Sequence, residues 1–327
     1  MKHTILAVIL SLCPHILNAE RPTGRLVLGG ASTPCITGWS CYNATISSPD
    51  VIENNSGKKA VLAIRRTNVT PVRGLVWMIG GHAGQVFWDR GTTLARTWED
   101  RMVAAGYDLV QYRHTGRGWP WAMLGNRQGF IRTACRPATA IRWTHDNWLR
   151  GGEFMILGSS QGSAAVGWAM AMYGLDSIVD RAVYISGPPM SDLIGACLDT
   201  GDLALAHPGE SGLVDEPDGY DSNGPCTLRT DTPDNRNWWL HNSVETADDT
   251  ILPGGATIGN YRYSGTRVGF IIGDKDSIRI RLHAQKLIDG FAAAGQPTTV
   301  MHIPGMGHPI TQSQAGLDAL FNFLTAP

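Results

Sequence analysis

Charged side chains are scarce in this 327-residue chain, and neither sign predominates. Asp, Glu, Lys and Arg make up 17% of the residues, and the formal net charge is −1. This balance argues against a general nucleic-acid-binding protein, because such proteins usually carry an excess of basic residues. The hydrophobic fraction of 43% excludes a disordered chain, which would be poor in apolar residues. The sequence is therefore that of a globular protein with one large domain or two smaller ones.

The chain also has no apolar run of the roughly 20 residues that a membrane-spanning helix requires. A shorter run, Thr4–Leu12, follows Met1-Lys2-His3 and precedes the small residue Ala19. This pattern predicts a secretory signal peptide over residues 1–19 and a mature protein in the extracellular or periplasmic space, without stable membrane insertion. The alternative is that residues 1–19 form a buried strand or helix.

Cysteine is infrequent, with six residues, one of them inside the predicted signal peptide. A secreted protein meets an oxidising environment, so we expect disulfides. Cys35 and Cys41 flank a glycine-containing turn and form the easiest pair, and Cys197 and Cys226 lie in one loop-rich segment. Cys135, on a predicted helix, would then remain as a buried thiol. Other pairings stay open, because spacing alone does not determine connectivity.

Two kinds of cofactor motif are missing. No group of His, Cys and Asp residues has zinc-ligand spacing, and no glycine-rich loop ends in Gly-Lys-Ser or Gly-Lys-Thr to hold a phosphate. We therefore expect neither a metal nor an organic cofactor.

From about residue 59 the chain alternates short apolar segments with longer amphipathic ones. The predicted strands are 59–66, 75–80, 107–113, 154–157, 182–186, 268–272 and 298–303, and the predicted helices are 92–105, 134–149, 161–173, 279–294 and 314–324. This alternation predicts an α/β fold with a mostly parallel central sheet and helices on both faces.

Residues 188–265 interrupt the alternation. The interval is rich in Gly, Pro, Asp and Asn and shows no clear strand–helix unit. Because a loop of this length without secondary structure is improbable in a compact domain, we interpret it as a cap or lid inserted between two parts of a core, residues 20–187 and 266–327. A separate small domain is the alternative.

A candidate nucleophile lies in the sequence Gly158-Ser-Ser160-Gln-Gly162. This Gly-x-Ser-x-Gly motif follows a predicted strand and opens a predicted helix, which is the strand-to-helix turn that the motif requires. Such a turn exposes the serine hydroxyl at the carboxyl edge of the sheet, beside a helix N-terminus that favours developing negative charge. An ordinary glycine-rich loop is the alternative for the motif taken alone.

A serine nucleophile needs a base, usually histidine, and the base needs an orienting acid. In this fold the acid and then the histidine follow the serine along the chain. Asp276 and His308 come in that order, each in a loop after a predicted strand, so we assign them as acid and base. Asp274 is a rival for the acid. Among rival bases, His302 would pack against a helix, and His283 would lie on a solvated helix surface.

Acyl transfer also needs hydrogen-bond donors for the oxyanion. One would be the backbone N–H of Gln161, directly after the serine. The second would come from the glycine-rich loop Gly80-Gly81-His82-Ala-Gly-Gln85, with the His82 N–H as the best donor.

Taken together, these elements resemble the secreted serine esterase and lipase branch of the α/β-hydrolase superfamily, over residues 59–187 and 266–325. The resemblance rests on the Gly80 loop, the Ser160 motif, Gly273-Asp-Lys-Asp276 and Gly305-Met-Gly-His308. It implies an α/β-hydrolase fold and hydrolysis of a small or polymeric carboxylic ester through an acyl-enzyme. A serine peptidase or amidase, an acyltransferase and a catalytically silent binding protein are the alternatives. Candidate pocket walls are Trp88, Trp119, Trp121, Trp238 and Trp239.

Overall fold

The computed structural model describes residues 21–49, 59–115, 118, 133–187, 189 and 261–327. Its strands are β1 (Arg25–Ala31), β2 (Ser40–Ser47), β3 (Lys59–Arg65), β4 (Gly74–Ile79), β5 (Tyr107–His114), β6 (Glu153–Ser159), β7 (Arg181–Ile185), β8 (Arg267–Gly273) and β9 (Thr298–Ile303). Its α-helices are α1 (Thr93–Ala104), α4 (Cys135–Trp148), α5 (Gln161–Met172), α11 (Ile278–Ala293) and α12 (Gln314–Thr325). Short 3₁₀ turns are η1 (His82–Gly84), η2 (Leu175–Ser177) and η5 (Ile310–Gln312).

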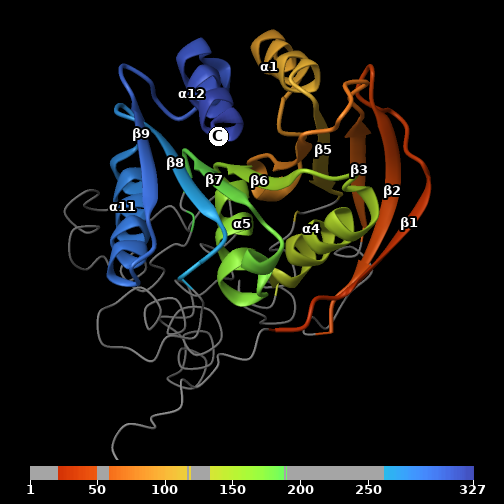
Figure 1. The fold of residues 1–327 in the computed structure, drawn as a ribbon, viewed down its shortest axis with the longest axis horizontal. Coiled ribbons are helices and arrows are strands. Elements are labelled where there is room, and N and C mark those ends of the chain that lie inside the picture. Colours follow the sequence, from red (N-terminus) through yellow and green to blue (C-terminus); the bar gives the residue numbers. More distant parts are fainter. Residues whose placement is uncertain (1–20, 50–58, 116–117, 119–132, 188, 190–260) are drawn as a thin grey trace, which may run out of the picture.

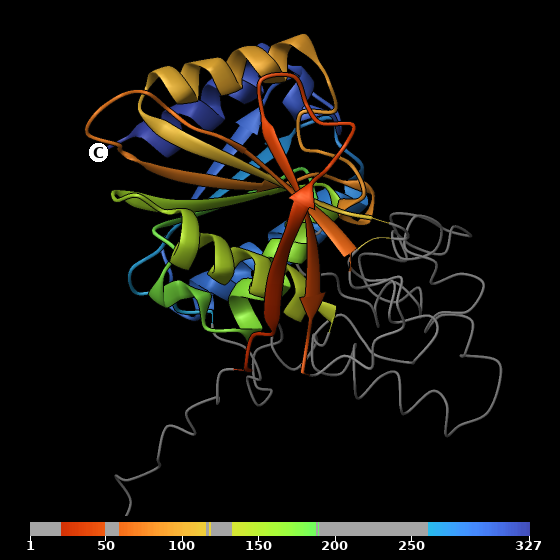
Figure 2. The same ribbon diagram turned by 90° about the vertical axis from the view of Figure 1, so that its right-hand side faces the viewer.

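The strands form one 9-stranded sheet in the order β1-β2-β3-β5-β4-β6-β7-β8-β9. Strands β5, β4, β6, β7, β8 and β9 are parallel, whereas β1, β2 and β3 extend the sheet in antiparallel fashion beyond β5. Helices α1 and α12 cover one face, and α4, α5 and α11 cover the other (Figures 1 and 2). The predicted α/β architecture with a mostly parallel sheet is confirmed.

The sheet separates two hydrophobic layers. On one face, Trp77 and Phe270 pack with residues of α4, α5 and α11, and on the other, Val76 and Met78 pack with residues of α1 and α12. Every residue of β4 is buried, because helices cover it from both sides. This double cover explains why the central strands read as continuous apolar runs in the sequence.

The sequence prediction missed β1 and β2. Both lie at the antiparallel end of the sheet, with β1 as its edge strand, and both have short buried stretches. β1 contains two glycines, and only Leu26 of its seven residues is buried. A half-exposed antiparallel strand gives a weak alternating pattern, so its apolar signal is diluted. Tyr261 and Tyr263, at the carboxyl end of the predicted cap, are buried and pack on Phe291 of α11.

The predictions for the three cysteines in the described part of the chain are confirmed. Cys35 and Cys41 form a disulfide, and Cys135 is a buried thiol on α4. The described residues do not include the predicted signal peptide (residues 1–19), Cys197, Cys226 or residues 190–260 of the predicted cap. In the described part of the chain, no helix is both long and apolar enough to cross a membrane.

Candidate active site

Ser160 occupies a sharp turn between β6 and α5. Its backbone has φ 57° and ψ −127°, a conformation that L-residues rarely adopt. The Ser160 N–H donates to the carbonyl of Ile185 on the neighbouring strand β7, at 2.9 Å, which fixes the turn to the sheet. The turn thus has the strained strand-to-helix geometry that the Gly-x-Ser-x-Gly motif requires.

Close backbone contacts explain why glycine flanks Ser160. A Cβ atom on Gly158 would lie 2.1 Å from the carbonyl oxygen of Gly162, and one on Gly162 would lie 2.5 Å from that of Ile79. A Cβ atom on Gly187, after β7, would lie 2.0 Å from the carbonyl oxygen of Ser160. Real Cβ atoms do not come this close to backbone oxygens, so any side chain at these three positions would displace the turn.

The loops after β8 and β9 bring Asp276 and His308 to Ser160. His308 Nε2 lies 2.9 Å from Ser160 Oγ, and His308 Nδ1 lies 3.2 Å from Asp276 Oδ1. The two loops are tied together, because the Lys275 N–H donates to the Met306 carbonyl at 2.8 Å. The two contacts of His308, with Ser160 and with Asp276, are within hydrogen-bond distance. The three side chains therefore form a continuous hydrogen-bonded chain from the carboxylate to the hydroxyl.

The environment distinguishes Asp276 from its rival. The Asp276 side chain is fully buried, and Oδ1 also accepts a hydrogen bond from the Ser277 N–H at 2.7 Å, whereas Asp274 is exposed. A buried carboxylate at the imidazole holds the ring orientation and stabilises its protonated form.

The surroundings of the two rival histidines are the reverse of those predicted. His302 is exposed because it lies on the solvent side of the edge strand β9, and His283 is 1% exposed on the sheet-facing side of α11.

The glycine-rich loop after β4 also reaches Ser160. A Cβ atom on Gly81 would lie 3.0 Å from Ser160 Cβ and 3.3 Å from its Oγ. His82 follows in η1 with φ 49°, and its N–H forms no hydrogen bond within the described residues. Gln161 is the first residue of α5, directly after Ser160, at the end of the helix where the backbone N–H groups point away from the helix body. The two predicted oxyanion donors therefore come from segments that meet at the serine.

Arg90, which the sequence analysis missed, reaches Gly81 beside Ser160. Its Nη2 atom would be 2.9 Å from a Cβ atom on Gly81. The pKa of His82 is lowered, first by burial and then by the positive charges of Arg90 and His308. A single arginine in a loop has no motif, so the sequence carried no signal for its position.

Of the five predicted pocket tryptophans, only Trp88 belongs to the described residues. Trp88 is 1% exposed and packs on Trp98 of α1, with ring centroids 5.0 Å apart. Its apolar ring is therefore part of the core beneath the loop and not a pocket wall, which corrects the prediction. Trp119, Trp121, Trp238 and Trp239 lie outside the described residues.

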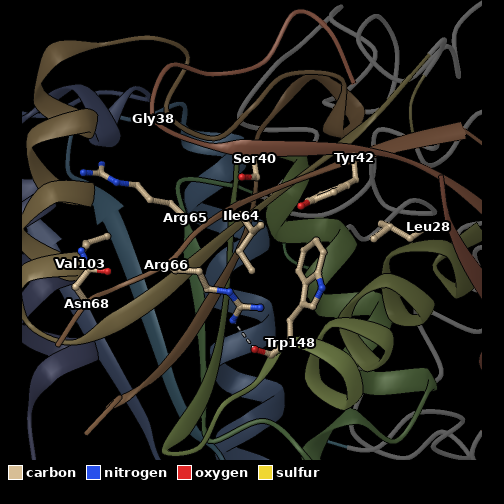
Figure 3. A pocket seen from close by; sticks show the side chains of 10 residues that line it. All are labelled: Leu28, Gly38, Ser40, Tyr42, Ile64, Arg65, Arg66, Asn68, Val103 and Trp148. Atoms are coloured by element: carbon tan, nitrogen blue, oxygen red, sulfur yellow. Dashed lines mark hydrogen bonds between the residues drawn. The ribbon is translucent and has the colours of Figure 1, made fainter. Parts of the chain in front are cut away.

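A cavity of about 570 Å³ lies elsewhere (Figure 3). Ile64, Arg65 and Arg66 line it at the end of β3, where Arg65 pairs with Leu109 near the start of β5. It therefore lies at the edge where the parallel strands begin, opposite to the edge that carries Ser160. Arg66 is not available to a ligand there, because its guanidinium binds Asp108 and the Trp148 carbonyl, each at 2.7 Å.

Within the described ranges, no group of three His, Cys, Asp or Glu residues could hold a metal ion.

The chain has the α/β-hydrolase fold: a mostly parallel sheet between helices, with a strained serine at the carboxyl end of a central strand. Solved structures that match this chain include esterases and a peptidase. Est1E from Butyrivibrio proteoclasticus is 14% identical with a TM-score of 0.52, and the match covers 86% of this chain and 97% of that one. The Est2 esterase from Thermogutta terrifontis is 12% identical with a TM-score of 0.51, over 84% and 90% of the two chains.

A puromycin-hydrolysing peptidase from Mycobacterium tuberculosis is 13% identical with a TM-score of 0.53, over 92% of this chain and 45% of that one. No family model matches the sequence, and no curated protein matches it. The fold predicted from the sequence is therefore confirmed by structural similarity alone, at identities too low to transfer a substrate.

Proposed function

We propose that the protein is a serine carboxylic-ester hydrolase with Ser160 as nucleophile, His308 as base and Asp276 as orienting acid. The observation that carries this proposal is the pair of contacts at His308, 2.9 Å to Ser160 Oγ and 3.2 Å to Asp276 Oδ1. Both esterase neighbours and the fold are consistent with it.

The proposed reaction has two halves. Ser160 Oγ attacks the ester carbonyl while His308 Nε2 takes the hydroxyl proton, and the protonated imidazole then gives that proton to the leaving alcohol. The resulting acyl-enzyme is attacked by water, with His308 again as base, and the acid is released. The backbone N–H groups of His82 and Gln161 would stabilise the oxyanion of each tetrahedral intermediate. None of these steps calls for a metal or an organic cofactor.

We include export from the cytoplasm in this proposal. The predicted signal peptide over residues 1–19 supports it, as does the Cys35–Cys41 disulfide, because disulfides persist in oxidising compartments.

Hydrolysis of p-nitrophenyl esters of increasing acyl length tests the proposed reaction, with matched p-nitroanilides as the amide comparison. Ser160→Ala should lower kcat by about a thousandfold or more. Ser159→Ala is the matched control, because it removes a neighbouring hydroxyl of the same turn, and it should retain activity within a few-fold. Activity that survives Ser160→Ala, or preferential cleavage of the anilides, would overturn the assignment as an ester hydrolase.

A further inference from the structure

The guanidinium of Arg90 lies beside the hydroxyl of Ser160. The same point in space, the Cβ position of Gly81, is 2.9 Å from Arg90 Nη2 and 3.3 Å from Ser160 Oγ. The two atoms are therefore no more than 6.2 Å apart, the sum of these distances. Any ester whose carbonyl carbon is within attack distance of Ser160 lies within reach of this cation.

The backbone around Arg90 is held firmly. Trp88 and Asp89 are buried, at 1% and 3% exposure, and the Arg90 N–H donates to the Phe87 carbonyl at 3.2 Å. Arg90 itself has φ 45°, in the left-handed region that non-glycine residues seldom occupy. Backbone outliers of this kind gather at functional sites, where the surrounding packing enforces them. Here the packing directs a charged side chain over Gly81.

Nothing in the described part of the chain neutralises this charge. No Asp or Glu forms an ion pair with Arg90 among those residues, since Asp89 faces Arg96, with Oδ2 3.6 Å from Nε. The ionisable groups that act on the same space are His82 and His308, and the carboxylate of Asp276 is engaged by His308. Because no acidic residue among those described pairs with Arg90, its guanidinium is available to an anionic group of a ligand at the site of attack.

We propose that Arg90 determines specificity by binding a carboxylate of the substrate, so that the preferred substrates are esters carrying a carboxylate near the ester carbonyl. This inference rests on the proposed ester hydrolysis. The guanidinium suits the role because its planar N–H groups match the two oxygens of a carboxylate. The short distance to Ser160 limits the carboxylate to a few bonds from the ester carbonyl, on the acyl side or the alcohol side.

Two pairs of esters test the proposal and separate the two sides. Monoethyl succinate and the neutral ethyl levulinate carry the difference on the acyl side, and acetoxyacetate and the neutral acetoxyacetamide carry it on the alcohol side. The wild-type enzyme should have a higher kcat/KM for the anion in at least one pair. Arg90→Gln should lower that kcat/KM roughly tenfold to a hundredfold, mainly through KM, and change the neutral esters by less than about threefold.

Controls separate binding of a carboxylate from a general effect of charge. Arg90→Lys keeps the charge and should restore part of the preference, and raising the salt concentration should reduce it. Arg25→Gln removes the same charge from an exposed arginine on the edge strand β1 and should leave the preference intact.

Three results would overturn the proposal: no preference for the anion in either pair, the same loss in Arg25→Gln, or an equal fall in kcat for all four esters in Arg90→Gln. The last result would place Arg90 on the oxyanion instead. Failure of the proposed function is distinguishable, because the wild-type enzyme would then hydrolyse none of the four esters, neutral or anionic.

Discussion

Close approach to Ser160 decides which residue can stand at position 81. A Cβ atom there would lie 3.0 Å from Ser160 Cβ, 3.3 Å from its Oγ and 2.9 Å from Arg90 Nη2. The first contact is with a side chain held by a strained backbone, so it cannot relax without moving the hydroxyl away from His308. At this scale, the absence of a side chain at Gly81 shapes the site as much as the reactive groups do.

Gly81→Ala should therefore lower kcat for a neutral ester by at least about tenfold, because displacements of about 1 Å at a reacting group have large effects on rate. Thermal unfolding should change little, since the new methyl group faces the open site and not the core. Gly30→Ala on β1 is the matched control, because a Cβ atom there meets nothing within 4 Å. Equal kcat in the two variants would show that the loop after β4 does not constrain Ser160.

At the scale of secondary-structure elements, the sequence predicted the units that carry the site. The strands and helices that hold Ser160, Asp276 and His308 are long, apolar or strongly amphipathic segments, and such segments give clear periodic patterns. The contact of α12 with β8 could not be predicted in the same way. It depends on Gly269, whose position would place a Cβ atom 2.8 Å from the ring of Phe323.

Gly269→Ala should destabilise the fold by about 1–3 kcal/mol, because it overpacks a buried strand against an aromatic ring. Gly290→Ala in α11 is the opposite case. A Cβ atom there meets nothing within 4 Å, so alanine should stabilise the helix by up to about 1 kcal/mol. Urea denaturation of both variants checks the pair, and a destabilised Gly290→Ala or an unchanged Gly269→Ala would contradict the packing described here.

Tertiary placement explains the errors in the site prediction. Trp88 lies in a loop near the correct edge, yet it packs into the core, because sequence alone does not reveal which way a loop side chain points. Arg90 was missed for the converse reason: it becomes relevant only when its backbone conformation brings it over Gly81. The order of serine, acid and histidine along the chain was informative because it reflects the connectivity of the sheet.

At the scale of the whole molecule, one buried carboxyl group links stability to pH. Glu99 of α1 is 1% exposed, and its Oε1 accepts from Gln111 Nε2 at 2.8 Å. Burial, aided by the negative charge of Asp89, raises the pKa of Glu99 to about 8. The folded protein therefore keeps a proton there at pH values at which the unfolded chain has lost it.

The sign of the effect follows from this difference. Between the unfolded pKa of 4.5 and the folded pKa of about 8, stability should fall as pH rises, by up to about 1.4 kcal/mol per pH unit. Above pH 8 the loss should level off. Glu99→Gln keeps an oxygen acceptor for Gln111 and cannot ionise, so its Tm should exceed that of the wild type at pH 8.5 and approach it at pH 5. Parallel Tm profiles for the two proteins would rule out the shifted pKa.

The central claim, that Ser160 is an activated nucleophile, is tested most directly by reaction of the folded protein with a fluorophosphonate probe, followed by peptide mass spectrometry. We expect a single adduct on Ser160, formed by the wild type and by Ser159→Ala and lost in His308→Ala. Circular dichroism of the same samples shows whether each is folded. A folded wild-type protein that forms no adduct on Ser160, or a His308→Ala variant that is labelled at the wild-type rate, would contradict the account.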